Sequence, residues 1–337
     1  MEADAFPQAI LDRFDLVGFD PRGVGASSAV SCPVSFDITD ADDVSRCIDR
    51  SHDLLAHLGT PNVARDLELI RVALGDPQLS YLGFSYGTAL GAVYATMFPA
   101  SVRALVLDGA IDPDAGIANE QAGAGYDFYV QQDFGTTLDV FFTLCDVSVL
   151  CPAGPDSESL LDDVYDEVRN LPVAYFGDHE PLRRVDVEDV VYGAMYGIFT
   201  WPLLAHALSD AADGDASTIA ALASYLRYGY PADMEAEPNF EFANLAIRCA
   251  DFSNRGADAF ECAPLPDSAD DLPVITAVDT PNPILVIGTD DDPATPGRYA
   301  GQLADALGDA VDINWAGAGH TAFLTSACVT DLTTAYL

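Results

Sequence analysis

The stretch LSYLGFSYGTALGAVYATMF, residues 79–98, joins an apolar run to a segment rich in small residues through Gly-Phe-Ser-Tyr-Gly at 83–87. Residues 79–84 have the composition of a buried strand, and residues 88–98 have that of a helix. A strand, a Gly-x-Ser-x-Gly turn and a helix together describe a nucleophile elbow. The stretch therefore predicts Ser85 as a nucleophile.

The turn at Ser85 must be tight, so the residues two positions away on either side must lack bulk. Gly83 and Gly87 meet that demand. The free N–H groups at the start of the following helix face the place where an oxyanion would form. The backbone N–H of Tyr86 is therefore a candidate oxyanion-hole donor.

Apolar runs typical of strands recur along the chain, and helical patterns lie between several of them. Thr60 can cap, and Pro61 can begin, a helix that Gly75 ends, and another helix ends at Gly308. The alternation predicts an α/β fold with a mostly parallel sheet and flanking helices. The strand-like runs are residues 14–19, 79–84, 102–107, 283–287 and 311–315.

The α/β pattern is interrupted in the middle of the chain by helical segments dense in aromatic residues. Residues 1–110 therefore read as the first part of an α/β-hydrolase core, and residues 281–337 as its C-terminal part. Residues 111–280 read as an inserted helical lid. Its aromatic side chains suit either the core of that insertion or a substrate pocket.

A serine nucleophile needs a base and an acid that holds the base, and both follow Ser85 in loops after strand-like runs. Asp292 follows the run at 283–287, and His320 follows the run at 311–315 within GAGHT. The order Ser, Asp, His is that of α/β-hydrolases. Asp290 and Asp291 compete with Asp292 for the role of acid.

The composition excludes several classes of partner. The chain has 54 acidic and 14 basic residues, a net charge of −40 and no lysine, so neither nucleic acid nor an anionic membrane surface is an expected partner. No apolar run is long enough for a membrane helix, and the first residues do not resemble a signal peptide. We hypothesise adaptation to brine; a GC-rich genome without halophily is the alternative.

Six of the seven cysteines fall in three close couples, and none of the spacings is a zinc pattern. Local couples beside loop-like sequence favour disulfides and an oxidising, extracellular compartment. The alternative is a set of buried cytosolic thiols. The couples are Cys32 with Cys47, Cys145 with Cys151, and Cys249 with Cys262, which leaves Cys328 alone.

The segments FDLVGFDPRGVGASS (14–28), LVLDGAIDP (105–113), GTDDDPATP (288–296) and GAGHTAF (317–323) resemble secreted tripeptidyl aminopeptidase-type serine peptidases. That family is related to the prolyl iminopeptidases. The resemblance implies release of short peptides, commonly three residues, or of single residues from free N-termini through an acyl-enzyme. The segment AIRCAD (246–251) is also similar to the family, and Asp251 at its end and Glu241 before it are candidates for binding the substrate amine. We expect a monomer without cofactor or metal.

The chain departs from the family in lacking the Gly-Gly-Pro-Gly-like loop that supplies a second oxyanion donor upstream of residue 14. We therefore expect an N-terminally truncated chain that lacks the first strands of the sheet. Loss of one oxyanion donor costs about 100- to 1000-fold in turnover. The alternatives are a carboxylesterase or lipase-like hydrolase with the same triad, and an inactive scaffold.

Overall fold

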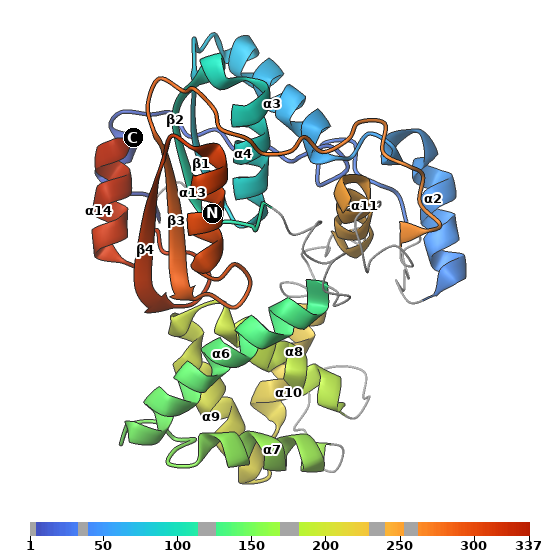
Figure 1. The fold of residues 1–337 in the computed structure, drawn as a ribbon. Helices are drawn as coiled ribbons and strands as arrows, with labels where there is room; N and C mark the ends of the chain where they lie inside the picture. Colours follow the sequence, from blue (N-terminus) through green and yellow to red (C-terminus); the bar gives the residue numbers. More distant parts are fainter. Residues whose placement is uncertain (1–4, 33–39, 114–125, 169–181, 229–239, 253–261) are drawn as a thin grey trace.

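A four-stranded parallel sheet with helices on either side forms the upper left part of the molecule in Figure 1. The computed structural model describes residues 5–32, 40–113, 126–168, 182–228, 240–252 and 262–337. Strands β1 (Leu79–Phe84), β2 (Val102–Asp108), β3 (Ile284–Asp291) and β4 (Ala310–Ala318) lie in that order. Each neighbouring pair is parallel, which confirms the predicted α/β sheet.

The prediction of a strand at residues 14–19 is wrong. This segment has no regular secondary structure and joins no ladder among the described residues, and Leu16 and Val17 are exposed. A strand needs a neighbour for its backbone hydrogen bonds, and an apolar run alone does not supply one. Phe14 instead lies beneath the guanidinium groups of Arg13 and Arg103.

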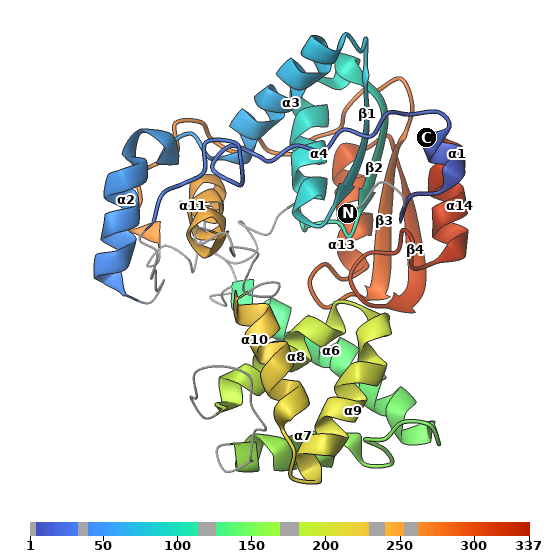
Figure 2. The ribbon, with the colours of Figure 1, turned by 180° about the vertical axis from the view of Figure 1, so that it is seen from behind.

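Helices cover both faces of the sheet (Figures 1 and 2). On one face lie α3 (Thr60–Leu74), α4 (Tyr86–Met97) and α13 (Arg298–Leu307), and on the other lie α1 (Gln8–Leu11) and α14 (Ala327–Tyr336). Alternate residues of β2 supply the two cores: Leu105 and Leu107 face the first, and Ala104 and Val106 face the second. Burial on both faces fixes the register of this strand, because a shift by one residue would exchange the two sets.

The start of α3 differs from the prediction. Gly59, not Thr60, is the N-cap residue, and no side chain caps the helix. The hydroxyl of Thr60 instead donates to Asp251, at 2.6 Å. The predicted end is confirmed, because Gly75 adopts the left-handed conformation with φ of 82°.

Between β2 and β3 the chain forms helices, five of which pack around a core of their own. We call α6 to α10 the helical insert; it lies beyond the ends of β3 and β4 (Figures 1 and 2). Phe141, Phe142 and Trp201 are buried in its core, whereas Phe199 is exposed. No helix in the described ranges has the length and apolarity needed to cross a bilayer. The insert comprises α6 (Tyr126–Val147), α7 (Ser157–Glu167), α8 (Arg184–Met195), α9 (Trp201–Ala212) and α10 (Ser217–Tyr228).

A further helix that precedes β3 in the chain, α11 (Phe240–Phe252), packs on α2 (Ala41–Leu55) rather than within the helical insert. Phe242 is fully buried in this contact. All three cysteine couples are disulfides, as predicted, and two of them brace the same region: Cys32–Cys47 and Cys249–Cys262. The third, Cys145–Cys151, closes the loop after α6, and Cys328 is exposed and carries no disulfide.

Candidate active site

Ser85 occupies the strained turn that its motif predicts. It lies between β1 and α4 with φ of 53° and ψ of −123°, a conformation that a residue with a side chain rarely adopts. A Cβ on Gly83 would come within 2.5 Å of the carbonyl oxygen of Gly87. The two glycines thus permit a turn that presents the serine side chain at the carboxyl end of the sheet.

The helix after Ser85 lies close to the sheet because Gly91 has no side chain; a Cβ there would be 2.5 Å from Leu107 Cδ2. Tyr86 is the first residue of α4, so its N–H has no acceptor within the helix. That N–H therefore belongs to the positive end of the helix dipole beside Ser85.

Asp292 and His320 are brought together by the loops after β3 and β4. Nδ1 of His320 lies 2.9 Å from each carboxylate oxygen of Asp292. Asp292 is 1% exposed and also accepts the N–H groups of Ala294, Thr295 and Thr321 and the hydroxyl of Thr295. These bonds fix the carboxylate, and the carboxylate in turn fixes the tautomer of the imidazole with Nε2 free for a proton.

The end of β2 lies between the Ser85 turn and the pair of Asp292 and His320. The backbone N–H of Ser85 donates to the carbonyl oxygen of Asp108, at 3.0 Å. A Cβ on the next residue, Gly109, would lie 3.4 Å from His320 Cε1. Ser85 and His320, both described, make no hydrogen bond with each other; such bonds often tighten only when substrate binds.

The two alternative acids lie differently. Asp290 accepts a hydrogen bond from the side chain of Asn314. Asp291 contributes its backbone oxygen, which accepts from Gly319 N at 3.1 Å and from the hydroxyl of Thr137 at 3.0 Å. Neither carboxylate bonds to His320 in the described structure, so the geometry favours Asp292.

Asp108 is a site residue that the sequence reasoning missed. Its carboxylate is fully buried and accepts the N–H groups of Ala322 and Phe323, just after His320. Burial raises the pKa of Asp108 to about 6, an effect that the two N–H donors oppose. A polar residue at the end of an otherwise apolar strand, in LVLDG, was the available signal.

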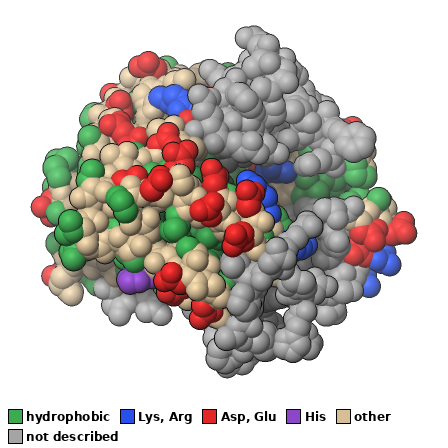
Figure 3. Space-filling view, turned by 90° about the horizontal axis from the view of Figure 1, so that it is seen from below, with side chains coloured by type: hydrophobic (Ala, Val, Ile, Leu, Met, Phe, Trp, Pro, Cys, Tyr) green, Lys and Arg blue, Asp and Glu red, His purple; other side chains and the backbone are tan. Residues whose placement is uncertain are grey.

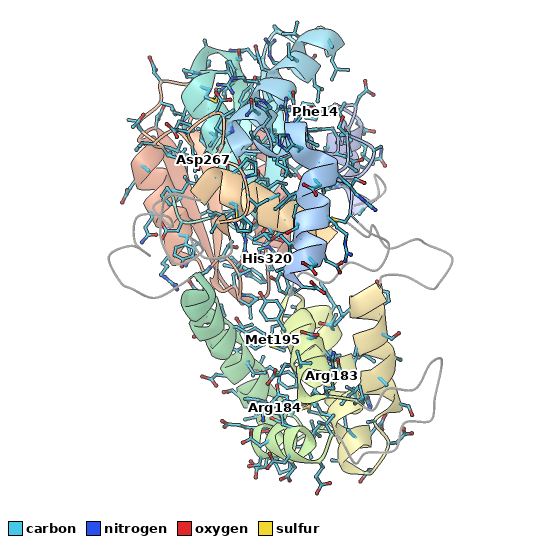
Figure 4. The ribbon with its side chains drawn as sticks, turned by 90° about the vertical axis from the view of Figure 1, so that its right-hand side faces the viewer. Phe14, Arg183, Arg184, Met195, Asp267 and His320 are labelled. Carbon is cyan, nitrogen blue, oxygen red and sulfur yellow. A yellow bond between two sulfur atoms is a disulfide. The ribbon has the colours of Figure 1, made fainter. Side chains whose placement is uncertain are left out.

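The helical insert meets the catalytic loops at several points. The backbone N–H of His320 donates to the carbonyl oxygen of Tyr196, which follows α8, at 2.8 Å. Figure 4 shows His320 above Met195, the last residue of α8, where sheet and insert meet. Arg298 at the start of α13 makes a bidentate ion pair with Asp133 of α6, at 2.8 and 2.6 Å. The insert thus contacts the α/β core at the loop that carries His320 and at the start of α13.

Of the two predicted amine-binding residues, Asp251 lies buried near the end of α11. Both its oxygens accept from Thr60, one from the backbone N–H at 2.7 Å and one from the hydroxyl. The hydroxyl of Thr60 also contacts that of Tyr86, at 2.5 Å. Burial raises the pKa of Asp251 to about 6. Glu241 belongs to α11, and its side chain is outside the described structure.

Two family models match the chain. One, described as the alpha/beta hydrolase fold, matches residues 2–142, and the other, described as TAP-like protein, matches residues 249–337. These segments contain Ser85, Asp292 and His320.

Individual proteins that are similar to the chain agree with these two family models. The chain is 31% identical to the serine protease Hip1 of Mycobacterium tuberculosis over 98% of its own length and 74% of the relative. It is 46% identical to the tripeptidyl aminopeptidase of Streptomyces lividans over 30% of its own length and 22% of the relative. It is also 32% identical to a Mycobacterium tuberculosis protein named carboxylesterase B, over 95% and 70% of the two chains. The chain therefore belongs to the TAP-like serine peptidases of the α/β-hydrolase fold.

Proposed function

We propose that this protein is a serine exopeptidase that releases tripeptides, other short peptides or single residues from free N-termini through an acyl-enzyme. The observation that carries the proposal is the combination of a strained Ser85 with a buried Asp292 that bonds His320. A chain that merely binds peptides has no need of either. The similarity to a tripeptidyl aminopeptidase supports the direction of cleavage.

In the proposed reaction, Ser85 Oγ attacks the carbonyl carbon of the scissile peptide bond while His320 Nε2 takes the hydroxyl proton. Asp292 stabilises the imidazolium that forms, and the N–H of Tyr86 donates to the oxyanion. The tetrahedral intermediate collapses when the C–N bond breaks and His320 gives its proton to the departing amine. A water molecule then attacks the ester by the same route and frees the short peptide.

An exopeptidase must also recognise the substrate's free amine, for which Asp251 and Glu241 remain our candidates. Asp251 is 6% exposed and already accepts two hydrogen bonds from Thr60. An ammonium group near it would have to share these oxygens. A secreted location fits the three disulfides, which persist in oxidising compartments.

The first test is covalent labelling of the purified chain with a fluorophosphonate probe, with Ser85→Ala as the control. Label that disappears in the variant establishes a working serine nucleophile. A folded wild type that takes no label contradicts the proposed catalysis and favours an inactive scaffold.

The second test compares a tripeptide amide that has a free amine with the same substrate acetylated at its N-terminus. An exopeptidase cleaves the free form much faster. Equal turnover, or turnover of the blocked form alone, contradicts the exopeptidase assignment.

A carboxylesterase is the second candidate function, because the relative named carboxylesterase B aligns with 95% of this chain. The triad does not choose between an ester and an amide. Hydrolysis of short-chain acyl esters without measurable cleavage of the free tripeptide amide would favour this function.

A further inference from the structure

Asp108 is a buried carboxylate that the reaction above does not use. It ends β2, is 0% exposed, and receives hydrogen bonds from the backbone rather than from an arginine in the described structure. An ionised carboxylate without a cationic partner is costly to bury. A residue kept for packing alone would be better apolar, so the contacts of Asp108 need another explanation.

The side chain of Asp108 holds the loop of the catalytic base. Ala322 N lies 3.1 Å from each carboxylate oxygen, and Phe323 N lies 2.7 Å from Oδ2. These donors follow His320 by two and three residues. The loop before them is bent, because Thr321 has a φ of 68° and Gly319 a φ of 99°. The carboxylate therefore holds the backbone directly after Thr321, a residue in a strained conformation.

The main chain at the same position holds the nucleophile. The carbonyl oxygen of Asp108 accepts the N–H of Ser85 at 3.0 Å. The next residue, Gly109, has a φ of 71°, and a Cβ on it would contact Thr295 Oγ1 and Thr321 Cγ2 at 3.0 Å. The segment Asp108–Gly109 thus contacts the Ser85 turn, Thr295, which bonds Asp292, and Thr321, which follows His320.

Charge couples Asp108 to the same groups. The groups that act on its carboxylate are Asp292 from the loop after β3, and His320 and two backbone N–H groups from the loop after β4. Repulsion from Asp292 favours the neutral form of Asp108, and attraction to His320 favours the ionised form. Ionised Asp108 in turn stabilises a protonated imidazole.

We propose that Asp108 is a positioning residue for catalysis: its carboxylate holds the His320 loop against the end of β2, beside Ser85, and its charge adds to that of Asp292 in stabilising the imidazolium. This rests on the proposed serine-hydrolase chemistry. The ester bond, the proton transfers and the substrate remain those of the reaction above. Asp108 itself exchanges no proton with substrate.

The test is Asp108→Asn, which keeps the shape but loses the charge and presents one N–H₂ group to backbone donors. Fluorophosphonate labelling across the pH range is the readout, because it needs no knowledge of the substrate. We expect the labelling rate to fall on the order of 10- to 100-fold, since small displacements of catalytic groups cost this much. The pH profile should also lose the inflection near pH 6 that the ionisation of Asp108 contributes.

The matched control is Asp305→Asn, the same chemical change on the exposed side of α13. It should label like the wild type at every pH. An Asp108→Asn variant that folds and shares the wild-type rate and pH profile overturns the proposal while leaving the serine nucleophile intact. A wild type that does not label overturns the proposed catalysis itself, and the two failures are thereby distinguished.

If Asp108→Asn does not fold, a measurement on the wild-type protein tests the proposal instead. The imidazole resonances of His320, assigned by their loss in His320→Gln, are followed by nuclear magnetic resonance from about pH 4 to 8. We expect these resonances to show an inflection near pH 6 from the ionisation of Asp108. Resonances that show no inflection from Asp108 overturn the proposal.

Discussion

Tyr196 and His320 are joined twice, once through the backbone and once through their rings. The carbonyl oxygen of Tyr196 accepts the N–H of His320 at 2.8 Å, and the rings meet edge to face with centroids 5.2 Å apart. Tyr196 directly follows α8, so the helical insert contacts His320, the proposed base, itself. The insert therefore supports His320, the proposed base, directly.

Tyr196→Ala should slow labelling by roughly two- to tenfold, because an aromatic pair contributes about 0.5–1.5 kcal/mol beyond its buried area. Tyr196→Phe is the matched control: it keeps the ring and the backbone acceptor and loses the contact with the hydroxyl of Tyr192, at 3.0 Å. An Ala variant as fast as the wild type, or a Phe variant as slow as Ala, would show that the ring does not support His320.

The choice of acid is tested by asparagine substitutions along the loop after β3. Asp292→Asn should lower turnover by about 10⁴-fold, because the amide disfavours the imidazole tautomer that leaves Nε2 free to take a proton. Asp290→Asn and Asp291→Asn should stay within about twofold of the wild type, because the geometry gives their carboxylates no bond to His320. Rates of ester or amide hydrolysis at saturating substrate check this. A larger loss at Asp290 or Asp291 would assign the acid differently.

The acidic surface leads to a prediction about salt. Carboxylates are spread over the face of the molecule in Figure 3, and the whole chain has a net charge of −40. Their repulsion acts over about 30 Å at 0.01 M salt but only about 3 Å at 1 M. The melting temperature should therefore rise by several degrees in molar sodium chloride. Sulfate is avoided, because its exclusion from surfaces stabilises proteins in general. An unchanged melting temperature would reject adaptation to brine.

The sequence predicts those parts of the structure that depend on local pattern. The parallel sheet, the elbow at Ser85 and the loops of Asp292 and His320 follow from apolar runs and from what comes directly after them. The unpaired segment at 14–19 shows the limit, since its composition is that of a strand but pairing depends on a neighbour.

Long-range partners set the other limit. Thr60 has the composition of a helix cap, yet its hydroxyl bonds to Asp251, 191 residues away. The partners of Asp108 are 214 and 215 residues away. No local pattern contains such a choice, because it depends on which groups the folded chain brings into the same buried space.

The buried carboxylate of Asp251 predicts how stability depends on pH. Its pKa is raised by burial from 3.8 to about 6, so its contribution to stability is fully present below about pH 4 and is lost as pH rises through 6. The shift corresponds to a loss on the order of 3 kcal/mol by pH 7. Asp251→Asn has no such titration. The stability of the wild type relative to this variant should therefore fall between about pH 4 and 7, as measured by urea unfolding. Asp108 titrates in both proteins, so its effect cancels.

Asp305→Asn, on the exposed side of α13, provides the control and should follow the wild type throughout. A constant difference between wild type and Asp251→Asn would mean that Asp251 titrates alike in the folded and unfolded chains.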